Sequence, residues 1–352
     1  MARVLRFVLA LALPLAIIGY PPLAQAADSI TDGQWYHAFL NTNAAHRMTE
    51  GAGIKVAVID SGVDATHPDL RGSILPGVDH SVLGPGDGRT DTSGHGTAMA
   101  SLIVGHGRVQ GIAPAAKIIP IRAFLADVGT ISAQNILWAV EQKADVISIS
   151  GGISTDNPLL RSAINEALRQ NIVVVAAAGN RPKDKAVLFP AAIPGVIAVS
   201  AVDRSGTVAD VSVSGAQIVL AAPGDKISVA YRGAWGTGSG TSNATAIVSG
   251  AVALIRGKYP DLSADQVVQR LTATVDDRGP AGRDPQYGYG VLNLVAALTT
   301  KASPSLEPDA SSTTSSPSNS DLGSNRMWLW IAAVSTLIGI LALIFVRSRR
   351  RG

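Results

Sequence analysis

Six unbroken runs of apolar residues, rich in valine and isoleucine, are the feature that most limits how this chain can fold. The runs do not alternate with polar residues, which is typical of strands buried on both faces. Helical patterns lie between them, over residues 132–143 and, after an opening proline, over residues 158–170. Strands that alternate with helices predict a three-layer α/β fold with a mainly parallel central sheet flanked by helices. The predicted strands are residues 55–59, 117–124, 145–150, 172–178, 196–202 and 218–221.

Three residues with the chemistry of a catalytic triad lie next to apolar runs. Asp60 directly follows the first run, and His95 and Ser242 each open an apolar stretch that is typical of a helix. A hydroxyl nucleophile, an imidazole base and a carboxylate that orients the base are the groups that acyl transfer needs. Sites in parallel sheets form at the carboxyl ends of strands, and helix N-termini favour negative charge. We therefore expect Asp60, His95 and Ser242 to be catalytic. A structural residue that caps a turn is the alternative for Asp60 taken alone.

Two further strand ends carry groups that this chemistry can use. Asn180 follows the fourth run, where its amide is a candidate donor to an oxyanion, although asparagine is also a common turn residue. Ser150, Gly151 and Gly152 close the third run, and a glycine-rich strand end can pair with an extended peptide. An ordinary turn is the alternative interpretation of these three residues. No grouping of His, Asp and Glu has the spacing of a metal site, so no metal or other cofactor is predicted.

The N-terminal end of the chain indicates export. Residues 1–26 combine Arg3 and Arg6 with an apolar stretch and finish on Ala24-Gln25-Ala26, the pattern of a cleavable signal peptide. An uncleaved membrane anchor is the alternative, and the cleavage pattern argues against it. Since the chain has no cysteine, it can form no disulfide and has no thiolate chemistry.

The C-terminal end indicates attachment to the cell membrane. Residues 327–346 are 20 residues without charge, about 30 Å of helix, which is the thickness of the hydrocarbon core. Residues 347–352 contain four arginines, which mark the cytoplasmic side. Residues 301–326 are rich in Ser, Thr and Pro and predict a disordered linker. We therefore expect a single-pass protein with an extracytoplasmic catalytic domain and a basic cytoplasmic tail.

The net charge of +3 comes from the two ends of the chain. Six arginines lie in residues 1–26 and 347–352, so the part between them carries a net charge of −3. That part has no excess of basic residues, and we expect no nucleic-acid partner.

Four segments place the candidate residues among characteristic neighbours in a fixed order. They are Val58-Ile59-Asp60-Ser61-Gly62-Val63-Asp64, Gly94-His95-Gly96-Thr97, Ala177-Ala178-Gly179-Asn180 and Gly240-Thr241-Ser242-Asn243-Ala244. Through them the chain resembles the subtilisin-like serine peptidases, in which the triad occurs in the order Asp, His, Ser. Within that family it most resembles the mycosins, the membrane-anchored peptidases of type VII secretion systems in actinobacteria. The additional segments that carry this similarity are Gly111-Ile112-Ala113-Pro114, residues 189–199, Ala221-Ala222-Pro223-Gly224 and Tyr287-Gly288-Tyr289-Gly290.

The resemblance implies a peptidase domain over residues 51–300, with residues 27–50 as an extension that lies on it. It also implies hydrolysis of a protein or peptide substrate through an acyl-enzyme, with Asn180 and the Ser242 N–H as oxyanion donors. A type VII secretion membrane complex is the implied partner. Two alternatives stay open: a mainly stabilising subunit of such a complex, and a leader peptidase for an exported peptide.

The chain departs from its family in two respects. Ala246 stands where the family usually has proline four residues after the nucleophile, and mycosins commonly have disulfides, which this chain lacks. A proline in the first turn fixes a helix start, so we expect its absence to loosen the setting of Ser242.

Overall fold

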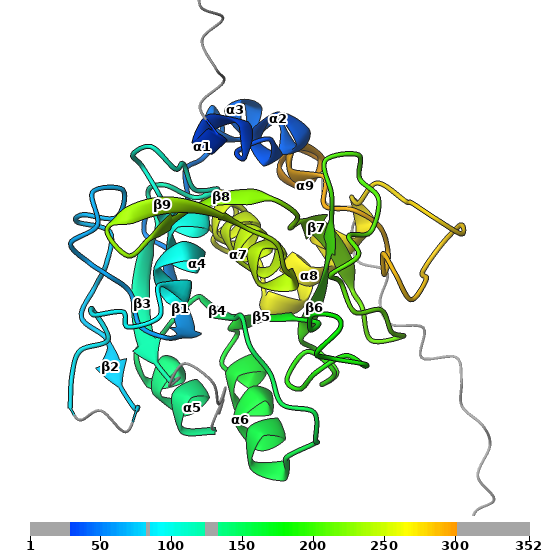
Figure 1. The fold of residues 1–352 in the computed structure, drawn as a ribbon. Coiled ribbons are helices and arrows are strands. Elements are labelled where there is room, and N and C mark those ends of the chain that lie inside the picture. The colour runs from blue at the N-terminus through cyan, green and yellow to red at the C-terminus, as the bar shows by residue number, and fades with distance from the viewer. Residues whose placement is uncertain (1–28, 82–84, 124–132, 301–352) are drawn as a thin grey trace, which may run out of the picture. The chain divides into compact units, whose positions relative to one another are not determined.

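The computed structural model describes residues 29–81, 85–123 and 133–300 (Figure 1). The predicted signal peptide, linker, transmembrane segment and basic tail lie outside these residues. Among the described helices, none has the length and apolar character needed to cross a membrane.

A seven-stranded parallel sheet forms the centre of the described region, in the order β2-β3-β1-β4-β5-β6-β7. The predicted α/β fold with a mainly parallel sheet is therefore confirmed. The six predicted strands all form, and β2 is a two-residue strand that the apolar pattern did not reveal. The strands are β1 (Lys55–Asp60), β2 (Val78–Asp79), β3 (Lys117–Arg122), β4 (Val146–Ile149), β5 (Val173–Ala177), β6 (Ile197–Val202) and β7 (Leu220–Pro223).

Both faces of the sheet are buried, which explains why the strands are continuously apolar. Along β1, Val56 and Val58 belong to one hydrophobic core, whereas Ala57 and Ile59 belong to the other. Successive side chains of a strand point to opposite faces, so a helix layer on each side requires an apolar residue at every position. Helices α5 and α6 cover one face, and α4 and α7 cover the other (Figure 1).

The helices begin where the sequence supplies capping groups. Asn157 accepts hydrogen bonds from the first turn of α6, and Ser263 forms a capping box with Gln266 at α8. The central helix α7 is buried from Thr241 to Arg256, and the absence of charged residues before Arg256 predicts this burial. These helices are α4 (His95–Val104), α5 (Ala133–Glu141), α6 (Pro158–Arg169), α7 (Thr241–Lys258), α8 (Ala264–Ala273) and α9 (Leu294–Thr299).

A β-hairpin leads into α7. Strands β8 (Ile227–Tyr231) and β9 (Ala234–Gly238) pair antiparallel around a turn at Arg232 and Gly233, which both have positive φ angles. The sequence prediction included only the parallel strands and missed this hairpin. Its turn lies beside Gly94, because a Cβ built on Gly94 would come within 2.7 Å of Arg232 Cγ.

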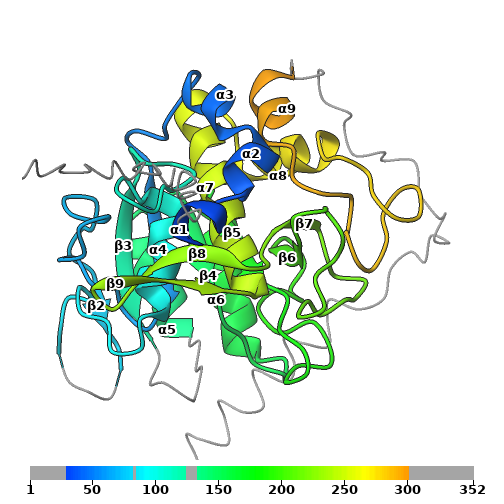
Figure 2. The same ribbon diagram turned by 45° about the horizontal axis from the view of Figure 1, so that its top comes forward.

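The segment before the sheet folds into three short helices that pack on the domain built around the sheet. These are α1 (Ser29–Asp32), α2 (Tyr36–Leu40) and α3 (Thr42–His46). Figures 1 and 2 both show them at the end of the molecule opposite α5 and α6. Tyr36 is fully buried and donates to the Gln110 carbonyl at 2.6 Å, and the Trp35 indole donates to the Asp225 carbonyl at 3.1 Å.

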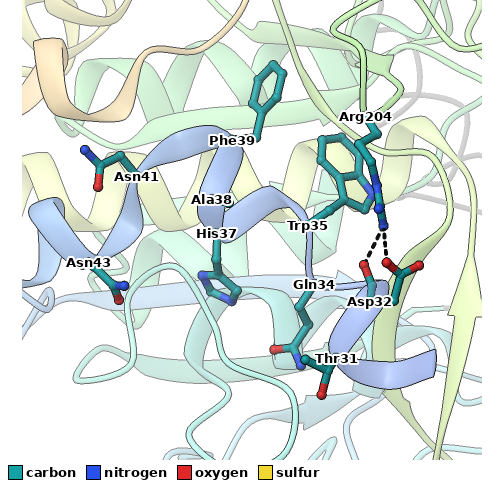
Figure 3. Close-up of a pocket in the computed structure, with 10 residues that line it drawn as sticks. All are labelled: Thr31, Asp32, Gln34, Trp35, His37, Ala38, Phe39, Asn41, Asn43 and Arg204. Atoms are coloured by element: carbon teal, nitrogen blue, oxygen red, sulfur yellow. Dashed lines mark hydrogen bonds and ion pairs between the residues drawn. The ribbon is translucent and has the colours of Figure 1, made fainter. Parts of the chain in front are cut away.

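A shallow pocket opens on this extension (Figure 3). An ion pair between Arg204 and Asp32, 2.9 Å long, borders the pocket beside the Trp35 ring. None of the predicted catalytic residues lines it.

Candidate active site

The structure joins Asp60 to His95 at the carboxyl end of β1. Asp60 is the last residue of that strand and is buried, and His95 is the first residue of α4. His95 Nδ1 lies 2.8 Å from Asp60 Oδ1 and 2.9 Å from Oδ2. A carboxylate can only accept, so Nδ1 carries the proton and Nε2 is the ring nitrogen left to act as a base.

Glycine at position 96 allows this close approach of helix and strand. A Cβ at Gly96 would lie 2.1 Å from the Gly62 carbonyl oxygen and 3.1 Å from Asp60 Cβ. Any side chain there would push α4 away from the end of β1 and separate His95 from Asp60. Both glycines that flank His95 are therefore required. Gly96 is required by packing, and Gly94 by its φ of 89°.

The pKa of His95 is raised above its ordinary value of 6.5. Burial of the ring acts in the opposite direction and lowers it, but the charge of Asp60 and its hydrogen bond outweigh burial. The Asp91 carboxylate adds a smaller contribution that also raises the pKa. This environment stabilises the imidazolium that a general base forms when it takes a proton.

Ser242 lies at the start of α7 and contacts the end of β4. Its Oγ donates to the Ser150 carbonyl at 2.9 Å. Because Ile149 pairs with Ile59, the residues that follow them, Ser150 and Asp60, end neighbouring strands. The three predicted triad residues therefore gather at one edge of the sheet.

Ser242 and His95 do not form a hydrogen bond among the described residues. The Ser242 side chain is buried, and its hydroxyl takes the main-chain carbonyl of Ser150 as its acceptor. A buried hydroxyl gains from the nearest acceptor, and rotation about one side-chain bond redirects it.

Asn180 is held directly against the start of α7. Its Oδ1 accepts from the Thr241 N–H at 2.9 Å and from the Thr241 hydroxyl at 3.2 Å. The Thr241 hydroxyl also contacts the main chain of Gly179. Because Oδ1 is used in this way, the Asn180 NH₂ group is left as the donor, next to the helix start that carries Ser242.

A short segment leads from the Ser242 contact towards Phe189. It consists of Ser150, Gly151 and Gly152. Ser150 is buried, and the two glycines are partly exposed. Ile153, which follows them, pairs antiparallel with Phe189. These three residues therefore form a short, open strand end beside the nucleophile.

Ala246 does not lie in the first turn of α7, where the prediction placed it. Helix α7 begins at Thr241, so Ala246 is its sixth residue and lies in the second turn. Its side chain is fully buried in the apolar core around α7. The first turn is fixed instead by the contacts of Thr241 with Asn180 and Gly179.

Sequence reasoning missed Asp91, which lies four residues before His95. Its carboxylate accepts from main-chain and hydroxyl groups around the start of α4. The only signal was an aspartate close before a Ser-Gly pair, a common turn pattern. Within the described residues, no three His, Asp or Glu side chains are grouped as metal ligands.

Comparison with known proteins gives a consistent result. The profile of the subtilase family matches residues 51–290. Subtilisin DY of Bacillus licheniformis is 37% identical over 258 residues, which cover 70% of this chain and 92% of subtilisin DY. The minor extracellular protease Epr of Bacillus subtilis (strain 168) is 36% identical over 261 residues, which cover 72% of this chain but 39% of Epr.

Similar solved structures include the mycosin proteases. MycP1 from Mycobacterium smegmatis superposes with a TM-score of 0.71 at 28% identity, covering 83% of this chain and 91% of MycP1. The MycP3 protease from the type VII (ESX-3) secretion system gives a TM-score of 0.68 at 30% identity, covering 79% of this chain and 90% of MycP3. The resemblance to subtilisin-like peptidases and mycosins is thus confirmed, and the chain belongs to the subtilase family of serine endopeptidases.

Proposed function

We propose that the chain is a membrane-anchored, extracytoplasmic serine endopeptidase with Asp60, His95 and Ser242 as its triad. The contact that carries this proposal is the bond from His95 Nδ1 to the buried Asp60 carboxylate. It fixes the tautomer in which Nε2 is free to accept a proton. The contact of Ser242, at the start of α7, with the neighbouring strand end supports the same assignment.

In the proposed reaction Ser242 Oγ attacks the carbonyl carbon of the scissile bond while His95 Nε2 takes the hydroxyl proton. The C–O bond that forms leaves a negative charge on the carbonyl oxygen, which the Asn180 amide and the Ser242 N–H stabilise. The imidazolium then gives its proton to the leaving amine as the C–N bond breaks. Water, activated by His95 in the same way, hydrolyses the acyl-enzyme.

The first step requires Ser242 to release the Ser150 carbonyl. An extended peptide that pairs along Ser150, Gly151 and Gly152 offers its own main-chain N–H groups to that strand end. Such pairing would satisfy the Ser150 carbonyl and allow the Ser242 hydroxyl to turn towards His95. A protein or peptide is therefore the substrate class that fits this site.

The cellular setting is proposed from the chain ends and the structural relatives. MycP1 is described as an essential component of the type VII (ESX-1) secretion system. A signal peptide in residues 1–26 and a span in residues 327–346 would hold the peptidase domain outside the cell membrane, beside such a complex. A stabilising subunit with incidental proteolysis is the second candidate, because a membrane-tethered domain can support a complex without cleaving anything.

Reaction with a fluorophosphonate probe tests the catalytic assignment. We expect the purified full-length chain to be labelled, and the Ser242→Ala variant to remain unlabelled, because the probe reacts with an activated serine hydroxyl. Ser239→Ala, which changes a nearby serine outside the triad, is the matched control and should label like the wild type. Labelling that persists in Ser242→Ala would contradict the assignment.

Secretion measurements separate the two cellular roles. In a deletion strain, the Ser242→Ala chain should restore secretion if the protein acts mainly as a stabilising subunit. It should fail to do so if proteolysis is essential.

A further inference from the structure

The Asp91 carboxylate is the most densely bonded acidic side chain near the candidate triad. Its Oδ1 accepts from the Gly94 N–H at 2.8 Å, the Ser93 N–H at 3.0 Å and the Ser61 hydroxyl at 2.8 Å. Its Oδ2 accepts from the Thr97 N–H at 2.9 Å and the Thr97 hydroxyl at 2.6 Å. All five partner groups donate their hydrogen to Asp91. This position therefore requires a side chain that only accepts hydrogen bonds, as a carboxylate does.

These bonds supply the cap that helix α4 otherwise lacks. The residue at its N-cap is Gly94, which has no side chain to accept from the first turn. The four N–H groups at a helix start need partners from outside the helix. Here they find four oxygens: Asp91 Oδ1 for the N-cap Gly94, Ser93 Oγ for His95, Ser61 Oγ for Gly96 and Asp91 Oδ2 for Thr97.

The same carboxylate reaches the strand that carries Asp60. Ser61 donates its hydroxyl to Asp91 and accepts from the Gly96 N–H at 3.0 Å. Its own N–H donates to Asp60 Oδ1 at 2.8 Å. One continuous hydrogen-bond path therefore links Asp91, through Ser61, to both members of the Asp60–His95 pair.

We propose that Asp91 is a positioning residue for catalysis, which holds the start of α4 and the end of β1 so that His95 and Asp60 keep their mutual geometry. This role rests on the proposed peptidase function. It follows from the bonding pattern, since the one carboxylate accepts both from main-chain N–H groups at the start of α4 and from the Ser61 hydroxyl. Asp91 does not touch the reacting atoms.

The role of Asp91 can be measured through the protonation of His95, which depends on the charges near its ring. Among the described residues, the charges that act on His95 are those of Asp60, which comes from β1, and Asp91, which comes from the loop before α4. Removing the charge of Asp91 leaves that of Asp60 in place. A change in the protonation of His95 therefore reports on Asp91 itself, whereas a loss of global stability does not.

Asp91→Asn is the variant that tests the proposal. In either orientation its amide hydrogens would face a main-chain N–H of Ser93, Gly94 or Thr97, so the cap is broken with almost no change in volume. We expect kcat per folded molecule to fall roughly 10- to 100-fold, since misplacement of a catalytic group by about 1 Å has effects of this size. KM should stay within about twofold, and the pH at which kcat/KM declines on the acid side should move lower.

The matched control is Asp87→Asn, which removes a partly exposed carboxylate from the same loop. Asp87 pairs with Arg89 and has no contact with α4. Its kcat and pH profile should equal those of the wild type. If Asp91→Asn does not fold, as judged by circular dichroism, Ser61→Ala interrupts the same path at its middle and should lower kcat at unchanged KM.

Titration of the His95 ring by NMR makes the outcome independent of turnover. In full-length protein in detergent, Asp91→Asn should lower the pKa of His95 relative to both the wild type and Asp87→Asn. A wild type without Ser242-dependent activity would overturn the proposed function. The ring titration of Ser61→Ala, which keeps the Asp91 charge but interrupts the path, would still test whether the path positions His95. Folded Asp91→Asn or Ser61→Ala with wild-type kcat and an unchanged His95 titration would overturn the inference.

Discussion

The protonation of His95 is set by the carboxylates beside it. Its pKa is raised because Asp60, and to a smaller extent Asp91, favour the charged ring more than burial opposes it. In the proposed mechanism the base must be neutral to take the proton of Ser242. We therefore expect activity above this pKa and its loss as the pH falls through it. The acid limb of the pH profile of kcat/KM should then lie at a higher pH than it would with a histidine of the ordinary pKa of 6.5.

Asp60→Asn tests this arrangement at a single residue. The amide can donate to Nδ1 and so stabilise the wrong tautomer, and we expect kcat to fall about 10⁴-fold. The acid limb of the residual kcat/KM should shift to lower pH, because the charge that raises the pKa of His95 is gone. Steady-state kinetics from pH 5 to 9 measure both effects. Asp156→Asn, an exposed aspartate paired with Arg161, should behave as wild type, and an unshifted limb in Asp60→Asn would argue against the electrostatic explanation.

Some helix caps in this fold lie beside the candidate active site, whereas others only stabilise their helix. The caps of α4 and α7 involve residues around His95 and Ser242, respectively. Helix α6 lies on the opposite face, and its Asn157 cap accepts from Leu159 and Leu160 at 2.9 and 3.2 Å. A substitution at the cap of α6 should therefore change stability alone, whereas one at the cap of α4 or α7 should also change activity.

Asn157→Ala should destabilise the protein without affecting catalysis. Loss of the cap is expected to lower the free energy of unfolding by about 1 kcal/mol. Urea denaturation measures this change, and kcat/KM should equal that of the wild type. Asn157→Gly is the matched comparison, since glycine at an N-cap costs only a few tenths of a kcal/mol. An unchanged free energy of unfolding in Asn157→Ala would mean that the side-chain hydrogen bonds do not stabilise α6.

The extension before the sheet joins parts of the molecule that are distant in sequence. Tyr36 and the His37 ring contact the Gln110 carbonyl in the loop after α4, and Trp35 contacts Asp225 before β8. Burial lowers the pKa of His37 to about 4, so its ring is neutral at pH 7 and donates a single hydrogen bond to that carbonyl. The extension therefore contacts the loop that follows α4 and the segment before the hairpin that leads into α7.

Trp35→Ala should destabilise the whole peptidase domain. Trp35 is buried and stacks edge-on against Phe39, and loss of such a side chain costs about 3–5 kcal/mol. Thermal unfolding should show a single transition at lower temperature, because the extension and the domain share one core. Leu159→Ala, which changes a side chain that is 72% exposed, should leave the transition unchanged. An early, separate transition in Trp35→Ala would instead mean that the extension unfolds independently.

Local patterns along the chain predicted the central sheet and two of its helices to within two residues at each end. Burial on both faces leaves a continuous apolar run, which is visible without any tertiary information. The β8–β9 hairpin and helices α1–α3 were not predicted, because they are short and their apolar residues have no clear period. Asp91 was missed for a related reason: its partners include Ser61, 30 positions away.

The sequence by itself determined the α/β class, the strand ends and the identity of Asp60, His95, Ser242 and Asn180 as candidates. Only the tertiary structure decided how these groups meet. It shows that His95 bonds Asp60 across 35 positions, and that the Ser242 hydroxyl bonds the Ser150 carbonyl across 92 positions. The reason is physical: periodicity reflects which face of an element is buried, whereas hydrogen bonds between distant residues depend on strand register and side-chain rotation.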